Sequence, residues 1–440
     1  MGYTEKYKWL EPKKKYNANL FTEEEINMVE VVRDFAQQKV KPRQWELEGG
    51  FHRDIESAWN VRDELWEEGV KIGLQQLNIP QAYGGLGVSL HCWMAIGAEL
   101  CRADAPFAAY SGKCAWSTGA VFASENEPLK EELASKLTGD DCWTSTVAFT
   151  EPQGGINIED ITQHFKTGMV TFKEEGDEWV INGQKVFPGP AGPAEVFLRP
   201  KLKGHLGYLL VATETDLAKR GWEGISLFWI PPDAKGLSFS NPYEKHGHVI
   251  DRNCDIFFDD VRIPKNNRVA GPDLAAKIYY GYILSSSRLS LAARITGAAE
   301  TLLEMCLDYT YFRDIKGKPV REYSYFAGIL GEMASRIHAS RAMWMDVASR
   351  RSRPDLYGNV WEQDNLHALN SAARLIAGQT FNFCAEKTWG LFGGYGYCCE
   401  THVEKFIRDV KLFIIGPGGP DRDVLDSSLM LYPWEWAGKD

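Results

Sequence analysis

Paired cysteines, long apolar runs and an excess of basic residues are all missing from this sequence. The nine cysteines are scattered, none forms a C-x-x-C pair, and only Cys398 and Cys399 are close together. That usage is typical of a reduced intracellular protein rather than of a disulfide scaffold. No apolar run approaches membrane-spanning length, and the N-terminal residues have neither an apolar signal core nor transit-peptide character. We therefore expect a soluble, cytoplasmic protein.

Basic residues are outnumbered by acidic ones. The chain has 49 Lys and Arg against 60 Asp and Glu, which gives a formal net charge of −11. An acidic chain is a poor ligand for nucleic acid or an anionic membrane, and we expect neither as a partner. The 440 residues are 44% hydrophobic, which is enough for a well-buried core in two or three domains.

Two common kinds of site also lack support. Four potential metal ligands are close together in the sequence: His246, His248, Asp251 and Cys254. No second cluster completes this set, so we expect no metal site. No G-x-G-x-x-G opens a βαβ pattern, which argues against a Rossmann site. The paired glycines at 154–155 and 393–394 could let a backbone approach a phosphate closely, although a structural turn is the simpler interpretation.

What the sequence does contain is three successive zones of different pattern. Residues 1–145 predict helices, residues 146–270 predict short strands, and residues 271–440 predict helices again. We therefore predict an α+β fold with an N-terminal helical domain, a middle β-barrel-like domain and a C-terminal four-helix bundle.

Local signals predict particular elements in each zone. Thr22 before three glutamates predicts a helix N-cap. Residues 168–187 alternate apolar and polar side chains around Glu175-Gly176-Asp177, and Asn182-Gly183 is a second tight-turn signal. The serines at 285–287 could cap the first helix of the bundle.

Eight motifs, taken in order, resemble the acyl-CoA dehydrogenase family across nearly the whole chain. They are IPQAYGGLGVSL (79–90), AFTEPQGG (148–155), INGQKVF (181–187), FFDDVRIPKNNRV (257–269), SRLSLAARITGAAE (287–300), YFRDIKGKPV (311–320), LGEM (330–333) and LFGGYGY with VEKFIRDVK (391–411). Because eight matches occur in the right order at sensible spacing, the chain is identified as a member of that family.

The resemblance implies a fold, an assembly and a reaction. It implies helices, a β domain and a four-helix bundle, assembled as a dimer of dimers, with FAD between the β domain and the bundle. It implies that a CoA thioester lies beside the flavin and loses an α-proton to a carboxylate and a β-hydride to FAD. An electron-transfer flavoprotein is the electron acceptor that we expect from it.

The resemblance also assigns cofactor positions, several of which depart from the usual pattern. The matching positions are Thr150, Gly155, Phe187, Gly189, Arg313, Gly393, Gly394 and Gly419. Phe187-Pro188-Gly189 stands where the family usually has W-I-T or W-I-S, so the aromatic is smaller and the hydroxyl donor is gone. Ile156, Lys316, Ser324 and Gly390 replace further usual residues. The residues therefore leave FAD binding open.

The usual catalytic glutamate is missing. Aligned on residues 408–411, that glutamate falls on Pro417, and a flavin-contacting threonine falls on Gly419. The other position that the family uses, directly before Arg288, holds Ser287. Neither proline nor serine can replace a carboxylate base. Arg288 itself matches an arginine near the substrate and CoA, and we expect it to bind the substrate.

Several hypotheses follow from a base that is non-standard or absent. Asp421 could supply the carboxylate for α,β-dehydrogenation, or it could simply cap the last helix. The chain could instead be a catalytically silent subunit of a mixed oligomer. It could also be a non-redox CoA-thioester enzyme, such as a lyase, hydratase or decarboxylase with little or no FAD, a flavin-dependent monooxygenase or oxidase, or a non-enzymatic assembly subunit. Dehydrogenation by a homotetramer is the leading hypothesis.

Overall fold

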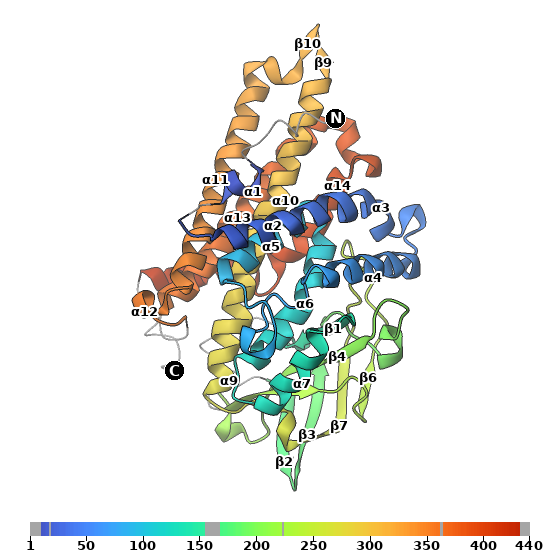
Figure 1. Ribbon diagram of the computed structural model, residues 1–440, viewed down its shortest axis with the longest axis vertical. Helices are drawn as coiled ribbons and strands as arrows, with labels where there is room; N and C mark the ends of the chain where they lie inside the picture. Colours follow the sequence, from blue (N-terminus) through green and yellow to red (C-terminus); the bar gives the residue numbers. More distant parts are fainter. Residues whose placement is uncertain (1–9, 17–18, 155–167, 222–223, 361–363, 432–440) are drawn as a thin grey trace.

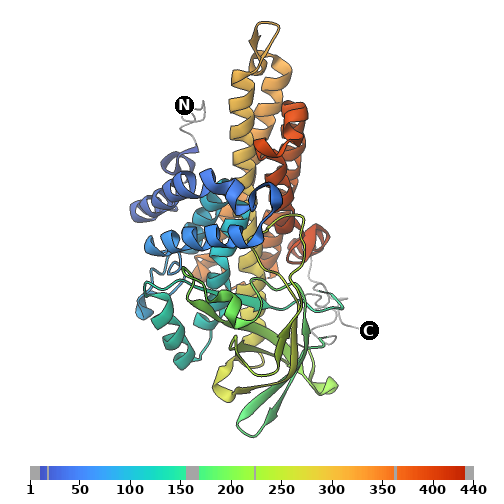
Figure 2. The same ribbon diagram turned by 90° about the vertical axis from the view of Figure 1, so that its right-hand side faces the viewer.

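The computed structural model describes residues 10–16, 19–154, 168–221, 224–360 and 364–431. Its sheet lies at one end of the molecule, the long C-terminal helices extend to the other end, and the N-terminal helices pack alongside them (Figures 1 and 2). The predicted α+β fold class is confirmed. No helix of the described residues is both long enough and apolar enough to cross a membrane.

Helices form the N-terminal part of the described chain. They are α1 (Pro12–Lys15), α2 (Glu23–Phe35), α3 (Gln44–Leu47), α4 (Ile55–Lys71), α5 (Leu90–Ala103), α6 (Ala105–Phe122) and α7 (Glu127–Leu137). The predicted N-cap at Thr22 is confirmed. Its hydroxyl accepts the Glu25 N–H at 3.2 Å, and the Glu25 carboxylate accepts the Thr22 N–H at 2.9 Å. This reciprocal capping box fixes the start of α2.

A sheet follows the N-terminal helices. Its strands are β1 (Trp143–Ala148), β2 (Thr171–Glu175), β3 (Glu178–Lys185), β4 (Gly204–Glu214), β5 (Ile225–Ile230), β6 (Leu237–Phe239), β7 (Ile256–Pro264) and β8 (Arg268–Ala270). Among the described residues the strand order is β6-β7-β3-β2-β4-β5-β8, and β1 pairs with β4 in parallel. The change from helix to strand therefore falls at Trp143, shortly before the expected boundary.

One of the two predicted turns in this sheet is confirmed and the other is wrong. β2 and β3 form an antiparallel hairpin around residues 176–177, where Gly176 has a φ of 60°. Asn182 and Gly183, in contrast, lie inside β3, where the register with β7 shifts. A side chain at Gly183 would place its Cβ 2.8 Å from Val170 Cα, so this glycine serves close packing of backbones rather than a turn.

Four long helices form the C-terminal bundle. They are α10 (Ser285–Phe312), α11 (Ser324–Arg351), α13 (Asp364–Phe392) and α14 (Val403–Ile415). Shorter elements accompany them: α9 (Leu274–Lys277), β9 (Asp314–Ile315), β10 (Lys318–Pro319), α12 (Pro354–Tyr357) and α15 (Gly419–Ser427). α10 lies at the centre and packs against α5, α11, α13 and α14.

The predicted serine cap of α10 is wrong. A π-helical segment, Ile278–Leu284, joins α9 to α10 without a break, so no helix end exists at Ser285 for a side chain to cap. The Ser285 hydroxyl instead donates to the Tyr280 carbonyl at 2.8 Å. Because the helix continues through the residues before the serines, carbonyls of those residues accept the backbone N–H groups that a cap would otherwise satisfy.

The hydrophobic cores explain how a cavity comes to lie between the domains. The largest core joins the N-terminal helices to the bundle, with Trp66, Leu100, Ile295 and Phe381 among its members. A second core packs one face of the sheet against α6 and α7, and a third lies within the β domain. α6 packs against β1, α10 and α14, and residues of α6 and α10 line the space where these cores meet.

Candidate functional site

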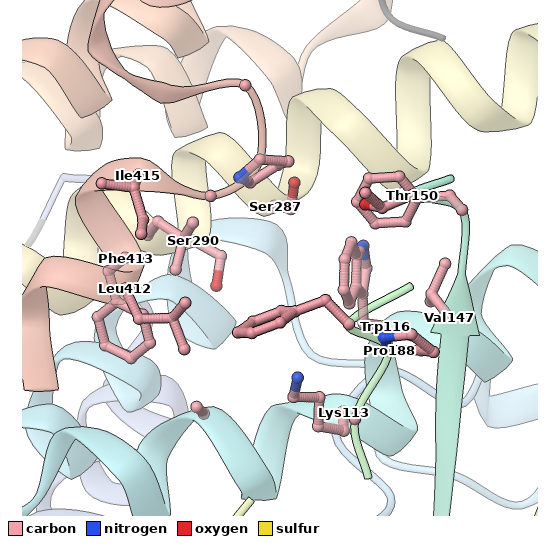
Figure 3. A pocket seen from close by; sticks show the side chains of 18 of the residues that line it. Lys113, Trp116, Val147, Thr150, Pro188, Ser287, Ser290, Leu412, Phe413 and Ile415 are labelled. Atoms are coloured by element: carbon pink, nitrogen blue, oxygen red, sulfur yellow. The ribbon is translucent and has the colours of Figure 1, made fainter. Parts of the chain in front are cut away.

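A cavity of about 590 Å³ lies between the β domain and the bundle. Figure 3 shows its walls: Lys113 and Trp116 from α6, Val147 and Thr150 from β1 and its end, Ser287 and Ser290 from α10, and Leu412, Phe413 and Ile415 from α14. The Lys113 side chain points into the cavity from the side opposite Ser287 (Figure 3). Most of the wall is apolar, so the few polar groups determine what can bind.

The structure brings several of the predicted site residues together. Thr150, Phe187, Gly189, Gly419 and Asp421 all line this cavity, although they come from distant parts of the sequence. Ser287 and Pro417 line it as well. Both positions from which the family usually supplies the catalytic carboxylate therefore face the cavity, and neither of them carries a carboxylate.

The segment after α14 is held in place by contacts with α13 of the bundle. Gly418 and Gly419 have φ values of 88° and 70°, which glycine adopts readily. Arg374 on α13 donates to the Gly416 carbonyl at 2.8 Å and pairs with the Asp423 carboxylate at 2.7 Å. This arginine, which sequence reasoning missed, holds both ends of the short segment that replaces the usual catalytic loop.

Asp421 lies in the first turn of α15, on the wall of the cavity and more than a third exposed. The N-cap of α15 is Gly418, and no side chain caps this helix. The interpretation of Asp421 as the cap is therefore wrong. Within the described part of the chain, the Asp421 side chain has no hydrogen bond or ion pair, so its carboxylate is available to a bound molecule.

The position of Thr150 is fixed by a buried ion pair. The Glu151 carboxylate accepts from Lys185 Nζ at 2.7 Å and from the Met169 N–H at 2.6 Å. The Val186 N–H donates to the Thr150 carbonyl at 2.9 Å. Sequence reasoning missed the roles of Glu151 and Lys185, although a lysine in an apolar strand pattern was a signal for a buried partner.

A second carboxylate, Asp251, also lines the cavity. It is buried and forms an ion pair with Lys113, with 3.2 Å between Nζ and Oδ2. Burial alone would raise the pKa of Asp251, but Lys113 and Lys245 hold it below its usual value, so the carboxylate stays charged.

The sequence grouped Asp251 with possible metal ligands and gave no sign of its place in the cavity wall. Of that group, His248 is bound to Asp409 instead: its Nε2 lies 2.9 Å from the Asp409 carbonyl oxygen. Within the described residues, no three His, Cys, Asp or Glu side chains gather in a way that could hold a metal ion.

Arg294 is the most unusual group in the cavity wall. Its side chain is 8% exposed, its Nη1 donates to the Ser290 hydroxyl, and its Nε has no hydrogen-bond partner. Across the described residues, no carboxylate forms an ion pair with it. Burial lowers the pKa of Arg294 to about 10, so the guanidinium remains charged at neutral pH. Sequence reasoning missed this residue because it lies within an apolar helical pattern.

Other expected site residues lie elsewhere. Arg288 is fully buried and pairs with Asp426, with 2.5 Å between Nη1 and Oδ2, and it is not part of the cavity wall. Arg313, Gly393 and Gly394 are exposed at the opposite end of α10 from Ser287. A helix of that length spans roughly 40 Å, so these three cannot reach the cavity of their own chain. Gly155 lies outside the described residues.

The residues around the cavity fit a flavin in the region of Thr150. The Phe187 ring is 40% exposed, Thr150 is half-buried with its hydroxyl at the end of β1, and a Cβ at Gly419 would meet no atom within 4 Å. A planar aromatic ligand could therefore lie against the Phe187 ring, the Thr150 hydroxyl and the unobstructed backbone at Gly419. The loss of a side chain at Gly189 has a structural cause, because its Cβ would lie 2.5 Å from Asn253 Nδ2.

Known families and proteins match this sequence and this fold. The acyl-CoA dehydrogenase N-terminal domain matches residues 22–139, the middle domain residues 146–261, and the C-terminal domain residues 279–422. The chain therefore belongs to the acyl-CoA dehydrogenase family, whose members are FAD flavoproteins.

Particular relatives give the family relationship more detail. The chain is 27% identical to glutaryl-CoA dehydrogenase of Desulfococcus multivorans, over 88% of this chain and 91% of the relative. It is 25% identical to the caffeyl-CoA reductase-Etf complex subunit CarC of Acetobacterium woodii, over 90% and 95% of the two chains. The butyryl-CoA dehydrogenase structure from Megasphaera elsdenii superimposes with a TM-score of 0.78 at 21% identity, covering 95% of this chain and 100% of that one. This last likeness shows the fold alone.

Proposed function

We propose that this protein catalyses α,β-dehydrogenation of a CoA thioester, with Asp421 as the base that removes the α-proton. The observation that supports this most strongly is the position of Asp421, which lines the same cavity as Thr150, Phe187 and Gly419 without a competing partner in the described chain. The names of the glutaryl-CoA and caffeyl-CoA relatives support a CoA thioester as the substrate.

The reaction needs one carboxylate and one hydride acceptor. The thioester carbonyl acidifies the α-carbon, Asp421 takes the α-proton, and a carbon–carbon double bond forms as the β-hydrogen leaves with its electron pair. When bound, FAD supplies the acceptor for that hydride. The apolar walls formed by Trp116, Phe149 and Leu291 exclude water, which favours an apolar stretch of acyl chain at the reacting carbons.

Asp421 is a better candidate for the base than Asp251. Asp251 is buried and already paired with Lys113 at 3.2 Å, so protonating it would leave the Lys113 ammonium without its counter-charge. Asp421 is exposed to the cavity, and its segment is anchored by Arg374 through the Gly416 carbonyl. A base must change its protonation state in each turnover, which suits the carboxylate with fewer fixed partners.

We also propose a homotetramer in which one copy completes the FAD site of another. Arg313, Gly393 and Gly394 are exposed and lie far from the cavity of their own chain, as a contact to a neighbouring copy requires. An electron-transfer flavoprotein is the proposed electron acceptor, supported by the name of the CarC relative.

The visible absorption spectrum of the purified protein tests the function. We expect FAD in stoichiometric amount, and we expect anaerobic addition of pentanoyl-CoA or glutaryl-CoA to bleach its absorbance. A protein that takes up no FAD when FAD is added would contradict the proposal. In that case, thioester consumption without flavin would indicate a non-redox enzyme. Absence of turnover together with a sequence-related co-purifying partner would indicate a silent subunit.

A further inference from the structure

Arg294 carries a buried positive charge for which the described part of the chain supplies no negative one. An arginine residue that is only 8% exposed loses most of its hydration, and the Ser290 hydroxyl replaces only a small part of it. Buried arginines elsewhere in this fold are paired: Arg288 with Asp426, and Arg374 with Asp423. A buried cation without a counter-charge at a cavity wall indicates a place for an anionic ligand.

The surrounding helices are built around this guanidinium. A Cβ at Gly112 of α6 would lie 2.4 Å from Arg294 Nη2, and a Cβ at Gly97 of α5 would lie 3.4 Å from its Cζ. Any larger side chain at Gly112 would displace the guanidinium. The two glycines therefore leave a slot in which the side chain is held against the cavity.

The neighbouring groups make this side of the cavity electropositive. Lys113 follows Gly112 on α6 and points into the cavity (Figure 3). Asp251 lies 3.2 Å from Lys113 and offsets its charge, whereas no carboxylate of the described residues forms an ion pair with Arg294. The Ser290 hydroxyl, one helical turn before Arg294, offers a further donor or acceptor.

The position of Arg294 along α10 sets the distance from the proposed reacting carbons. Ser287, Ser290 and Arg294 lie on one face of the helix, and all three line the cavity. Because the guanidinium reaches back to Ser290, it lies one to two turns, roughly 5–10 Å, along the helix from Ser287. Ser287 lies beside the segment that follows α14 (Figure 3), and Asp421 lies in the first turn of α15, which this segment leads into. A short acyl chain can cover that distance.

We infer that the substrate of this enzyme is a short-chain ω-carboxyacyl thioester of CoA, whose free carboxylate binds Arg294 while its α-carbon lies near Asp421. The planar guanidinium can donate two parallel hydrogen bonds to the two carboxylate oxygens. Ser290 orients the guanidinium through its hydroxyl. This inference rests on the proposed function, because that function places the α-carbon of the acyl chain near Asp421.

The test compares two thioesters with the same number of acyl carbons. Equilibrium dissociation constants are measured by titration calorimetry for glutaryl-CoA, which ends in a carboxylate, and pentanoyl-CoA, which ends in a methyl group. We expect the protein to bind glutaryl-CoA about tenfold more tightly or better. Arg294→Met, which keeps the side-chain length and removes the charge, should lower that preference by about tenfold or more. Arg294→Lys should restore part of it.

A control variant is Arg336→Met. Arg336 is an exposed arginine on α11 that pairs with Glu332, and its loss should leave the ratio of the two dissociation constants unchanged. Equal affinity of the unmodified protein for the two thioesters would overturn the inference, whether or not any variant folds. An unchanged ratio in a folded Arg294→Met protein would also overturn it.

Failure of this inference is distinguishable from failure of the proposed function, because binding is measured without turnover. A preference for glutaryl-CoA without flavin bleaching would contradict only the dehydrogenation. Flavin bleaching by pentanoyl-CoA without a preference for the carboxylate would contradict only the inference about the substrate.

Discussion

Arg288 and Asp426 form a fully buried ion pair, with 2.5 Å between Nη1 and Oδ2. Ser371 and His367 also contact this nitrogen of Arg288, at 3.0 Å and 2.7 Å. Two turns further along α10, Arg294 is buried without any such carboxylate in the described chain. One helix thus carries one arginine that ties it to α13 and α15, and a second that faces a cavity.

Arg288→Met should destabilise the protein because it leaves the Asp426 carboxylate buried without its principal cation. Breaking one partner of a buried pair costs roughly 3–5 kcal/mol. Urea unfolding at fixed protein concentration, followed by tryptophan fluorescence, measures the loss in free energy of unfolding. The affinity for CoA thioesters of any folded fraction should change little, since Arg288 is not part of the cavity wall.

Arg294→Met is the matched comparison on the same helix. Because it removes a buried charge that has no partner carboxylate, it should leave the free energy of unfolding unchanged or raise it. Equal destabilisation by the two substitutions would show that Arg294 has a structural counter-charge after all. Loss of stability in the Arg294 variant alone would contradict the assignment of both residues.

The stability of the protein should fall on acidification partly because of His248. Burial lowers the pKa of this imidazole from 6.5 to about 4, despite the opposing effect of Asp409. The unfolded chain therefore binds a proton in this pH range that the folded chain does not, and the free energy of unfolding decreases as pH falls from 6.5 towards 4. A single such group contributes a loss of about 2 kcal/mol between about pH 7.5 and 5.

His248→Asn isolates this contribution, since asparagine tolerates the left-handed φ of 54° at this position. Urea unfolding at both pH values should show a loss of stability smaller by about 2 kcal/mol in the variant. A variant with the same pH dependence as the unmodified protein would mean that the pKa of His248 is the same in the folded and unfolded chains. The neighbouring charges to consider in that event are Lys245, Asp251 and Asp409.

The arrangement of the fold was predictable because it follows from local periodicity. Helical and alternating patterns identified the three zones, and Thr22 with its glutamates fixed the start of α2. The errors arose where tertiary structure overrides a local signal. Asn182-Gly183 has the composition of a turn, yet Gly183 serves a close backbone approach inside β3. The serines at 285–287 have the composition of a cap, yet the preceding residues continue the helix.

The site was predictable only where the family pattern assigned a position. That pattern placed Thr150, Phe187 and Gly419, and the glutamate that it lacks led to the hypothesis that Asp421 is the base; all four residues line one cavity. It could not reveal Arg294 or Asp251, because their importance lies in which charges surround them in space. Whether a buried arginine has a carboxylate partner depends on α5, α6 and α10 together, and no short stretch of sequence contains that information.

Exchange of the substrate α-proton with deuterated solvent tests the central claim most directly. We expect the unmodified protein to catalyse exchange into a bound CoA thioester, and Asp421→Asn to slow it by about 100-fold or more while thioester affinity is retained. Glu400→Gln, which removes an exposed carboxylate outside the cavity wall, should exchange at the normal rate. Exchange at the normal rate in Asp421→Asn would contradict the account, and its loss in Asp251→Asn would identify Asp251 as the base instead.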